Sequence, residues 1–313
     1  MRKRQDYIFL YVKGICMGVA EVIPGVSGST AALLTGIYDE LIQSLKSINR
    51  DAVKHLFQKK FRDFWRMING NFLLTILAGI TTTFLLGARL VLYALKHYPV
   101  PFGSFLFSLM VMAAPLVMRE EIKKWDTGII ICFVVALLVA YAMTFIPPIH
   151  PPRTFGMIFF VGVVAGAAAL VPGLSFILVL ILLGQYGFIT SAFAEFNSLA
   201  LLIFILAYAL GLLGMSRILS HFLSKFRKAT LALLLGVMIG SLNKVWPWRQ
   251  VLEFATNRKG DQIQAFDKSI LPWDYFATTG KDPQVIQAIL MMALGVFIVI
   301  LIDRIASRRK TTF

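Results

Sequence analysis

The residues whose side chains could most clearly bind a ligand or a proton lie in one stretch, 18–38, which reads GVAEVIPGVSGSTAALLTGIY. It places an acid and a helix-breaking pair ahead of small and hydroxyl residues: Glu21, Pro24, Gly25, Ser27, Gly28, Ser29 and Thr30. Proline stops a helix and glycine permits a sharp turn, so we expect a new helix to begin near Ser27 with this serine as its N-cap. The first amides of that helix lack intrahelical partners, which suits them to an anion, particularly phosphate.

Glu21 lies one helical turn before Pro24 in an otherwise apolar segment. An ionised carboxylate is costly there unless it is paired or hydrated, which favours a group that binds a proton or couples a cation. The alternative is a structural role, in which Glu21 pairs with an arginine or with the amides of residues 27–29. The break has a structural alternative as well, in which it only eases packing and the serines cap it.

A second stretch, 166–186, repeats the pattern as GAAALVPGLSFILVLILLGQY. Seven residues in and just before the first stretch match seven in and just before the second at one constant offset: Gly14, Gly18, Pro24, Gly25, Ser27, Gly36 and Tyr38 against Gly162, Gly166, Pro172, Gly173, Ser175, Gly184 and Tyr186. Ala169 stands where Glu21 would have its counterpart, so any role of the acid belongs to the first half alone. The sequence therefore predicts two helix breaks, at Pro24-Gly25 and at Pro172-Gly173.

Two arginines, Arg89 and Arg217, occupy comparable places near the ends of the apolar segments that follow the breaks. An arginine in a span faces the protein interior or extends to the lipid headgroups. The first arrangement supplies a two-pronged clamp for phosphate, and the second anchors the helix end. Lys13 is a weaker candidate, because it lies close to the basic N-terminal cluster. The predicted phosphate-binding set is Ser27, Gly28, Ser29, Thr30, Arg89, Ser175 and Arg217.

Membrane spans account for most of the chain. Of its 313 residues, 58% are hydrophobic and only 15% are charged, which leaves little room for a soluble domain. Windows such as 127–147 carry no charge and are long enough to cross the hydrocarbon core of a bilayer as a helix. The full spans that we predict are 70–96, 101–118, 127–146, 198–222, 228–245 and 284–304.

The formal net charge of +15 reflects membrane topology rather than a nucleic-acid partner. Basic residues fall in short segments between apolar runs, as in 46–66 and 119–124, which is the distribution of cytoplasmic loops. We therefore expect cytoplasmic N- and C-termini and an attraction to anionic lipid. Segment 246–283 has mixed charge without a basic excess, so we expect it outside. Segment 49–69 is amphipathic and is expected on the cytoplasmic membrane face, as an anchor or as a regulatory element.

The predicted fold is an all-α polytopic membrane protein built from two inverted repeats. The expected sides of the loops place both ends of 7–48 in the cytoplasm and both ends of 154–196 outside, so each segment is a hairpin. Each hairpin is broken near its middle, and its arms cross the bilayer or enter it partway. The first repeat, 1–150, holds hairpin 7–48, amphipathic segment 49–69 and spans 70–96, 101–118 and 127–146. The second, 151–313, holds hairpin 154–196, spans 198–222, 228–245 and 284–304, and extracytoplasmic segment 246–283. Each hairpin is followed by three spans. Because three is an odd number, the second repeat starts on the opposite side of the membrane and is inverted relative to the first, an arrangement typical of secondary transporters.

Catalytic and metal-binding motifs are absent from the sequence. It contains no His-Glu zinc motif, no Ser-His-Asp arrangement and no Walker loop. Cys16 and Cys132 both lie in apolar segments and form neither a disulfide framework nor a metal motif. We expect no cofactor, no metal and no bond chemistry.

The first stretch, KGICMGVAEVIPGVSGSTAALLTGIYDELI, resembles the bacterial polyprenyl-phosphate translocase family (PopT type), formerly a family of unknown function. The resemblance continues through VPGLSFILVLILLGQY, SRILSHFLSKFRKATLALLLGVMIGS and the WPW at 246–248, and covers nearly the whole chain. The second motif departs from the family's Pro-Gly-x-Ser-Gly-Ser, because Phe176 and Ile177 follow Ser175.

This resemblance implies transport of undecaprenyl phosphate, the single-chain lipid carrier of cell-wall assembly, from the outer to the inner leaflet of the cytoplasmic membrane. A phosphate-binding cavity at mid-membrane with a lateral opening for the prenyl tail would suit that ligand. Two other classes remain open: a secondary transporter of a small organic anion, which would use the same breaks in a sealed site, and a membrane scaffold without transport. The scaffold predicts that Glu21, Arg89 and Arg217 tolerate substitution.

Overall fold

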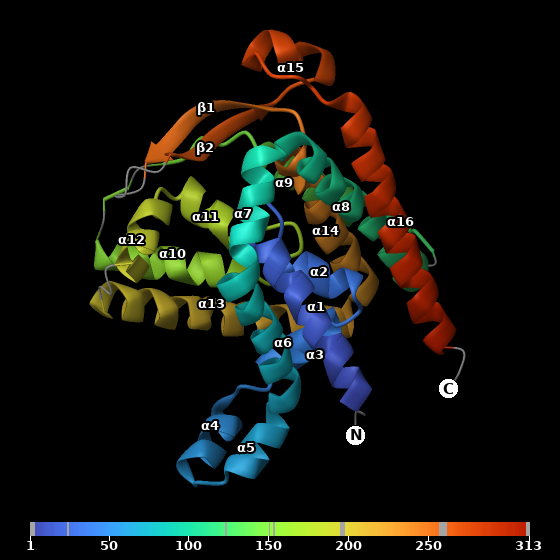
Figure 1. Cartoon of the computed structure of the whole chain (residues 1–313). Helices are drawn as coiled ribbons and strands as arrows, with labels where there is room; N and C mark the ends of the chain where they lie inside the picture. The colour runs from blue at the N-terminus through green and yellow to red at the C-terminus, as the bar shows by residue number, and fades with distance from the viewer. Residues whose placement is uncertain are drawn as a thin grey trace.

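The chain is mainly α-helical in the computed structural model, which describes residues 4–23, 25–122, 124–149, 151–152, 154–194, 198–256 and 262–310 (Figure 1). Within these residues, four helices are long and apolar enough to cross a membrane, or five if one bent pair counts as a single span. An all-α polytopic membrane architecture is therefore confirmed, with the addition of one two-stranded sheet. Pro24, one of the predicted helix-breaking residues, lies outside the described residues.

Each half of the chain begins with a set of three helices that is interrupted at a break. The first consists of α1 (Arg4–Val22), α2 (Gly28–Leu34) and α3 (Tyr38–Lys46), and the second of α10 (Phe155–Ala168), α11 (Phe176–Leu182) and α12 (Tyr186–Ala194). Gly25 and Gly173 turn the chain at the two breaks with φ of 91° and 88°. Such values are strained for residues that carry a side chain, so the two glycines match in conformation as well as in sequence.

Each hairpin has a second bend, so its second arm is not the single helix that we predicted. At the end of α2, the Ile37 amide donates to Ala32 O at 2.9 Å and the Gly36 amide donates to Leu33 O at 3.2 Å. This is a Schellman motif, which ends a helix at a glycine with positive φ. Gly184 ends α11 in the same way, and α11 and α12 meet at an angle of 117°.

Closely packed glycines join each hairpin to the long helix that follows it. The first long helix is continuous from Gly70 to His97. It comprises α6 (Gly70–Thr82), a π-helical segment η1 (Thr83–Gly87) and α7 (Ala88–His97). A Cβ atom at Gly18 of α1 would lie 2.7 Å from Cβ of Thr83 in η1. In the second half, a Cβ atom at Gly162 of α10 would lie 2.7 Å from Cβ of Ala207 in α13 (Ser198–Lys225). The repeated glycines therefore let α1 approach α6–η1 and α10 approach α13.

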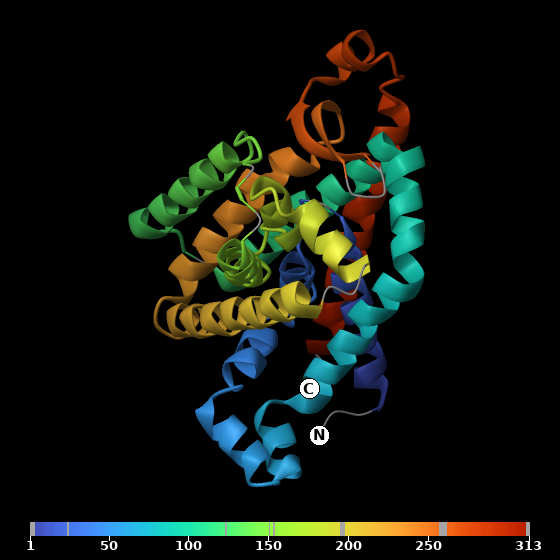
Figure 2. The same cartoon turned by 90° about the vertical axis from the view of Figure 1, so that its left-hand side faces the viewer.

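The remaining apolar helices pair between the two halves. They are α8 (Pro99–Glu121), α9 (Thr127–Met143), α14 (Arg227–Gly240) with its 3₁₀ extension η2 (Ser241–Val245), and α16 (Val285–Lys310). Helix α8 packs on α16, and α9 packs on α14. In both pairs a helix of the first half packs on a helix of the second half, which is what a pseudo-two-fold relation between the halves would produce. In Figures 1 and 2, however, α13 crosses the direction of α6–α7, and the inversion of one half relative to the other stays a prediction.

The amphipathic segment forms two short helices, α4 (Arg50–Phe57) and α5 (Phe61–Met67). They meet at Lys59, whose φ is 58°, and Phe57 and Phe61 are 83% and 62% exposed. Such exposed aromatic side chains between basic residues fit the predicted position at a membrane surface.

Segment 246–283 folds into a β-hairpin and a short helix, which the sequence analysis did not predict. The antiparallel strands are β1 (Arg249–Thr256) and β2 (Gln262–Ser269), followed by α15 (Pro272–Thr279). The hairpin and α15 lie at one end of the molecule, and α4 and α5 lie at the other (Figures 1 and 2). Helix α1 begins, and α16 ends, toward the α4–α5 end.

Candidate functional site

The first break has the predicted N-cap, and its amides are already occupied. The Ser27 side chain is fully buried and accepts a hydrogen bond from the Ser29 amide at 3.3 Å. The hydroxyl groups of Ser27 and Ser29 lie 2.6 Å apart. The Gly28 amide donates to Glu21 Oε1 at 2.8 Å. The side chains of Glu21 and Ser27 therefore occupy the positions at which an external anion would meet this helix end.

Glycine at position 28 makes the approach of Glu21 possible. A Cβ atom there would lie 2.7 Å from Glu21 Oε1, closer than van der Waals contact allows. The second carboxylate oxygen, Oε2, is shielded from solvent and has no hydrogen-bond partner among the described residues. Glu21 also lies within electrostatic range of the Tyr208 hydroxyl on α13.

The two breaks meet in the structure. Thr30 Oγ1 accepts a hydrogen bond from the Gly173 amide at 2.9 Å, and both groups are buried. The Tyr38 hydroxyl donates to Leu170 O at 2.8 Å, also in a buried position. Residues more than 130 positions apart are therefore joined at the point where both helices are interrupted. These contacts place the two breaks side by side, whereas the inversion of one half relative to the other stays a prediction.

At the second break, buried polar groups make fewer hydrogen bonds than at the first. Ser175 precedes α11 and is fully buried, but its hydroxyl makes no capping hydrogen bond and has no partner in the described structure. Gln185, at the bend between α11 and α12, is also fully buried, and neither atom of its amide group has a partner among the described residues. Buried polar groups without partners are costly, and they mark places where a ligand or water would bind.

Gln185 was missed by the sequence analysis. Its counterpart in the first half is Ile37, which is buried and apolar. A polar residue where the repeat has an isoleucine in the first half was the signal that would have identified it.

The structure does not bring the two predicted arginines to the breaks. Arg217 on α13 donates to Leu213 O of its own helix and to Ile48 O, both at 2.9 Å. Arg89 lies near the start of α7 and is exposed. Within the described part of the chain, neither guanidinium is hydrogen-bonded to Ser27, Thr30 or Ser175. Lys13, considered a weaker candidate, points inward and donates to Thr35 O at 2.6 Å, where α2 ends.

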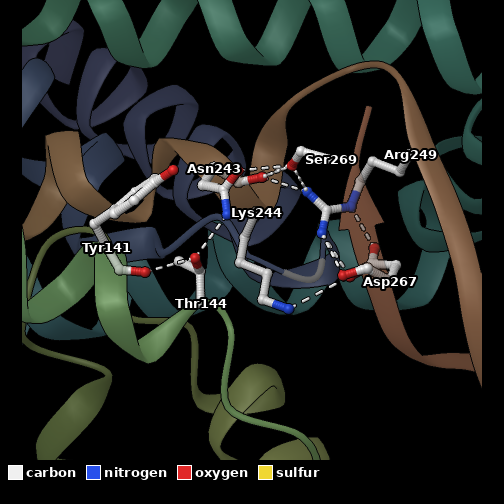
Figure 3. Close-up of polar contacts among 7 residues, drawn as sticks. All are labelled: Tyr141, Thr144, Asn243, Lys244, Arg249, Asp267 and Ser269. Carbon is white, nitrogen blue, oxygen red and sulfur yellow. Dashed lines mark hydrogen bonds and ion pairs between the residues drawn. The ribbon is translucent and has the colours of Figure 1, made fainter. Parts of the chain in front are cut away.

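A cationic cluster that the sequence analysis also missed lies where η2 enters the β-hairpin (Figure 3). Arg249 binds the Asp267 carboxylate through Nε and through Nη2, the latter at 2.6 Å, and Lys244 Nζ approaches the same carboxylate at 3.4 Å. Arg249 also donates to Asn243 O and to the Ser269 hydroxyl. Burial alone would raise the pKa of Asp267, but the hydrogen bonds from Arg249 and the charges of both cations outweigh it and hold this pKa below its usual value.

The pKa of Asp267 predicts acid sensitivity of the hairpin. Because the folded value lies below the unfolded one, the ion pair stabilises the docked hairpin above about pH 4, and this stabilisation is lost as the pH falls through the folded value. We expect Asp267→Asn to destabilise docking at neutral pH by about 1.5–3 kcal/mol, the range for a hydrogen bond to a charged group. Limited proteolysis of the hairpin against pH tests this. A variant that resists cleavage as well as the wild type at pH 7 would contradict it.

A second ionic network lies at the other end of α14. Arg227 donates to both oxygens of Glu121 at the end of α8, at 2.9 and 3.0 Å, and to Asp39 on α3 at 2.8 Å. These side chains are substantially exposed, so the network contributes little to stability. It nevertheless joins α3, α8 and α14 on the side away from the β-hairpin. Among the described residues, no three His, Cys, Asp or Glu side chains gather in a way that would hold a metal ion.

The family of the chain follows from comparison with known proteins. A family model described as undecaprenyl phosphate translocase-like matches residues 17–263, a range that includes both breaks together with Lys244 and Arg249. The chain belongs to this family. Among curated members, a polyprenyl-phosphate transporter of Vibrio cholerae serotype O1 is 33% identical over 306 residues, which covers 98% of this chain and 99% of that protein.

A polyprenyl-phosphate transporter of Staphylococcus aureus is 29% identical over 255 residues, covering 75% of this chain and 85% of that protein. No solved structure matches the chain. The family assignment therefore rests on sequence comparison alone.

Proposed function

We propose that this protein carries a polyprenyl phosphate, with undecaprenyl phosphate as the expected ligand, from the outer to the inner leaflet of the bacterial cytoplasmic membrane. The family and the names of its relatives support a transported polyprenyl phosphate. The observation that carries the proposal is the meeting of the two breaks at Thr30 and Gly173, with Glu21 held at the first break. In this proposal the protein moves its ligand and makes or breaks no covalent bond.

The contacts at the breaks support a phosphate site that is closed in this structure. Ser27, Ser29, Thr30 and Ser175 are each 2% exposed or less. A phosphate would replace Glu21 at the Gly28 amide and would meet the buried hydroxyl of Ser175, which lacks a partner among the described residues. Glu21 and Ser27 already accept from the first amides of α2, so side chains must supply part of the phosphate contacts.

Proton coupling through Glu21 follows from the same geometry. An ionised carboxylate occupies the Gly28 amide and repels a phosphate, whereas a protonated one repels it less. We therefore propose that proton binding at Glu21 favours phosphate binding at the break, and that the two are linked reciprocally.

We propose that Arg217 and Arg89 bind the phosphate at successive stages of transport, because they lie toward different ends of the molecule. Arg217 contacts Ile48, just before α4, and Arg89 lies on α7, which runs toward the β-hairpin end (Figure 1). Replacing either with lysine loses the planar fork that binds two oxygens. We expect Arg217→Lys and Arg89→Lys to lower transport about tenfold.

Transport in liposomes and thermal unfolding together test this expectation. Arg62→Lys on α5 is the matched control, because Arg62 is exposed and belongs to the amphipathic segment rather than to a predicted span. Wild-type transport by both arginine variants would contradict the proposed role. A loss of transport with a parallel loss of folded protein would assign the arginines to stability instead.

The orientation in the membrane yields a separate prediction. The α4–α5 end is expected in the cytoplasm together with both termini, and the β-hairpin and α15 are expected outside. Cysteines introduced at Lys59 and Asp274, each in a background without Cys16 and Cys132, should react with an impermeant maleimide from opposite sides of the membrane. Labelling of both from the same side would refute this topology and the inversion that depends on it.

The test of the proposed function is transport of labelled undecaprenyl phosphate in liposomes that contain the purified protein, with and without a pH or sodium gradient. Faster movement between leaflets than in protein-free liposomes supports the proposal. A small labelled organic anion in the same liposomes tests the alternative cargo.

A further inference from the structure

Helices α4 and α5, residues 50–67, form a surface whose apolar side chains are not covered by any described part of the chain. Phe57 and Phe61, on either side of the turn at Lys59, are the most exposed of these side chains. Four more are at least 37% exposed: Val53, Leu56, Trp65 and Met67. Figures 1 and 2 show the two helices projecting from one end of the molecule. This α4–α5 surface therefore lacks a partner among the described residues.

The α4–α5 surface is also strongly basic. It contains six Lys or Arg residues and two Asp residues, so its net charge is +4. All six basic side chains are exposed, and none of them forms a hydrogen bond or an ion pair with another described residue: Arg50, Lys54, Lys59, Lys60, Arg62 and Arg66. Unpaired cations beside exposed aromatic and aliphatic side chains are typical of segments that lie in the interface of an anionic bilayer.

A candidate membrane span begins directly after this surface. Helix α5 ends at Met67, and the long apolar helix of residues 70–97 starts at Gly70. The two pack together, because a Cβ atom at Gly70 would overlap the indole ring of Trp65, whose Nε1 donates to Asn71 Oδ1 at 2.7 Å. Tryptophan is enriched at the boundary between hydrocarbon and water. The bilayer that receives this span therefore adjoins the α4–α5 surface.

The charge of the surface distinguishes anionic lipid from a second copy of the chain. Two copies that met there would bring two charges of +4 together, which like-charge repulsion opposes. Lipid phosphates carry the opposite charge, and each Lys or Arg close to an anionic leaflet strengthens binding about fivefold. The surface therefore fits an anionic leaflet better than it fits itself.

Both ends of the α4–α5 surface are hydrogen-bonded to helices that lie in different halves of the chain. Asn69, which precedes α6, donates through Nδ2 to Glu40 Oε1 at 2.9 Å and to Ser44 Oγ at 3.2 Å, both on α3. Ile48 O, two residues before α4, accepts from Arg217 on α13 at 2.9 Å. The position of α4 and α5 is thus linked to the first hairpin and to Arg217.

We propose that the α4–α5 surface binds the anionic phospholipid headgroups of the adjoining leaflet, and that this contact holds α3 and Arg217 in the arrangement that transport requires. The apolar side chains enter the boundary of the hydrocarbon, and the six cations meet the lipid phosphates. The lipid contact does not depend on the proposed function, whereas its effect on transport rests on it. Transport is therefore expected to depend on the charge of this leaflet.

A fluorescent probe in the turn between the two helices tests the lipid contact. Gln58 is exposed and uncharged, so Gln58→Cys, labelled with bimane in a chain without Cys16 and Cys132, keeps the basic and apolar side chains in place. The full chain is placed in nanodiscs of phosphatidylcholine alone or of equal parts phosphatidylcholine and phosphatidylglycerol. Phosphatidylglycerol should lower quenching by aqueous acrylamide and raise quenching by brominated acyl chains, and high salt should reverse both changes. A probe at Ala277→Cys on α15 is the control and should not respond to phosphatidylglycerol.

Neutralising one cation on each helix separates charge from folding. Lys54→Gln combined with Lys60→Gln should weaken the lipid contact about twentyfold and abolish protection of the probe, whereas Lys54→Arg combined with Lys60→Arg should keep it. Lys281→Gln, an exposed cation beyond α15, is the matched control and should leave protection unchanged. In liposomes, phosphatidylglycerol should raise the rate of undecaprenyl phosphate transport several-fold for the wild type and for the arginine variant, but not for the glutamine variant.

Equal quenching by acrylamide with and without phosphatidylglycerol would refute the lipid contact. Protection that appears in detergent without lipid and grows with protein concentration would also refute it, because a second copy would then cover the surface. If the probe responds to phosphatidylglycerol but the glutamine variant transports like the wild type in both lipids, the link to α3 and Arg217 is refuted and the proposed function stands. If the wild type moves no undecaprenyl phosphate in either lipid, the proposed function fails, and the probe alone decides the lipid contact.

Discussion

Replacing Glu21 with glutamine is expected to remove the pH dependence of transport while leaving binding of the lipid phosphate intact. The glutamine side chain keeps the size of Glu21, and its amide oxygen can still accept from Gly28 as Glu21 Oε1 does at 2.8 Å. It cannot ionise, so the site no longer alternates between a form that repels phosphate and one that admits it. For the wild type, one linked proton changes phosphate affinity by up to about tenfold per pH unit.

The measurement is the pH profile of undecaprenyl phosphate transport in liposomes, for the wild type and for Glu21→Gln. We expect a sloping profile for the former and a flat one for the latter. Gly28→Ala is a useful companion, because a Cβ atom there would displace Glu21 Oε1 from the break without changing the titrating group. Coinciding profiles for wild type and Glu21→Gln would assign the carboxylate a structural role and end the case for proton coupling through it.

Replacing Gln185 with leucine is expected to stabilise the fold and impair transport. Gln185 is fully buried, and its amide group has no partner among the described residues, an arrangement that costs about 1–3 kcal/mol. An apolar side chain of similar size removes that cost, so we expect the free energy of unfolding to rise by about this amount. If the amide group serves the substrate, transport should fall about tenfold, the loss of one good hydrogen bond.

A rise in stability together with a fall in transport would show that the Gln185 amide group serves function rather than folding. Ile37→Leu, at the matching position of the first half, is the control and should alter neither quantity strongly. Chemical unfolding in detergent and transport in liposomes give the two readings. Transport at the wild-type rate in Gln185→Leu, or a clear loss of stability, would contradict the role assigned to Gln185.

The repeat could be predicted because it depends on local conformation. Gly25 and Gly173 both turn the chain with positive φ, and Gly36 and Gly184 both end a short helix, so the spacing of glycines in the sequence records the spacing of bends. The second bend in each hairpin was contained in the same pattern. It was overlooked because the arms were treated as single helices.

Contacts between distant residues could not be predicted from one sequence. The hydrogen bond between Thr30 and Gly173 joins residues 143 positions apart, and nothing in either stretch specifies it. Thr30 was predicted to bind phosphate, and in this structure its hydroxyl instead accepts from the other break. The pair Arg249 and Asp267 depends on the register of a β-hairpin in a segment for which we predicted a side of the membrane but no secondary structure.

The arginines show where the sequence argument was weakest. Their comparable positions suggested one shared site, but Arg217 binds the carbonyl of Ile48 and Arg89 is exposed on α7. The direction of a side chain depends on helix rotation, which position along a span does not reveal. Their role in binding phosphate stays a prediction, for which the lysine variants are the test.

The central claim is that this chain moves a polyprenyl phosphate between leaflets through its paired breaks. The most direct measurement is the rate at which labelled undecaprenyl phosphate reaches the opposite leaflet of liposomes that contain wild-type protein, with undecaprenol and protein-free liposomes as controls. The account predicts protein-dependent movement of the phosphate form and no acceleration for undecaprenol. Equal rates with and without protein, for a folded preparation tested at both acidic and neutral pH, would contradict it.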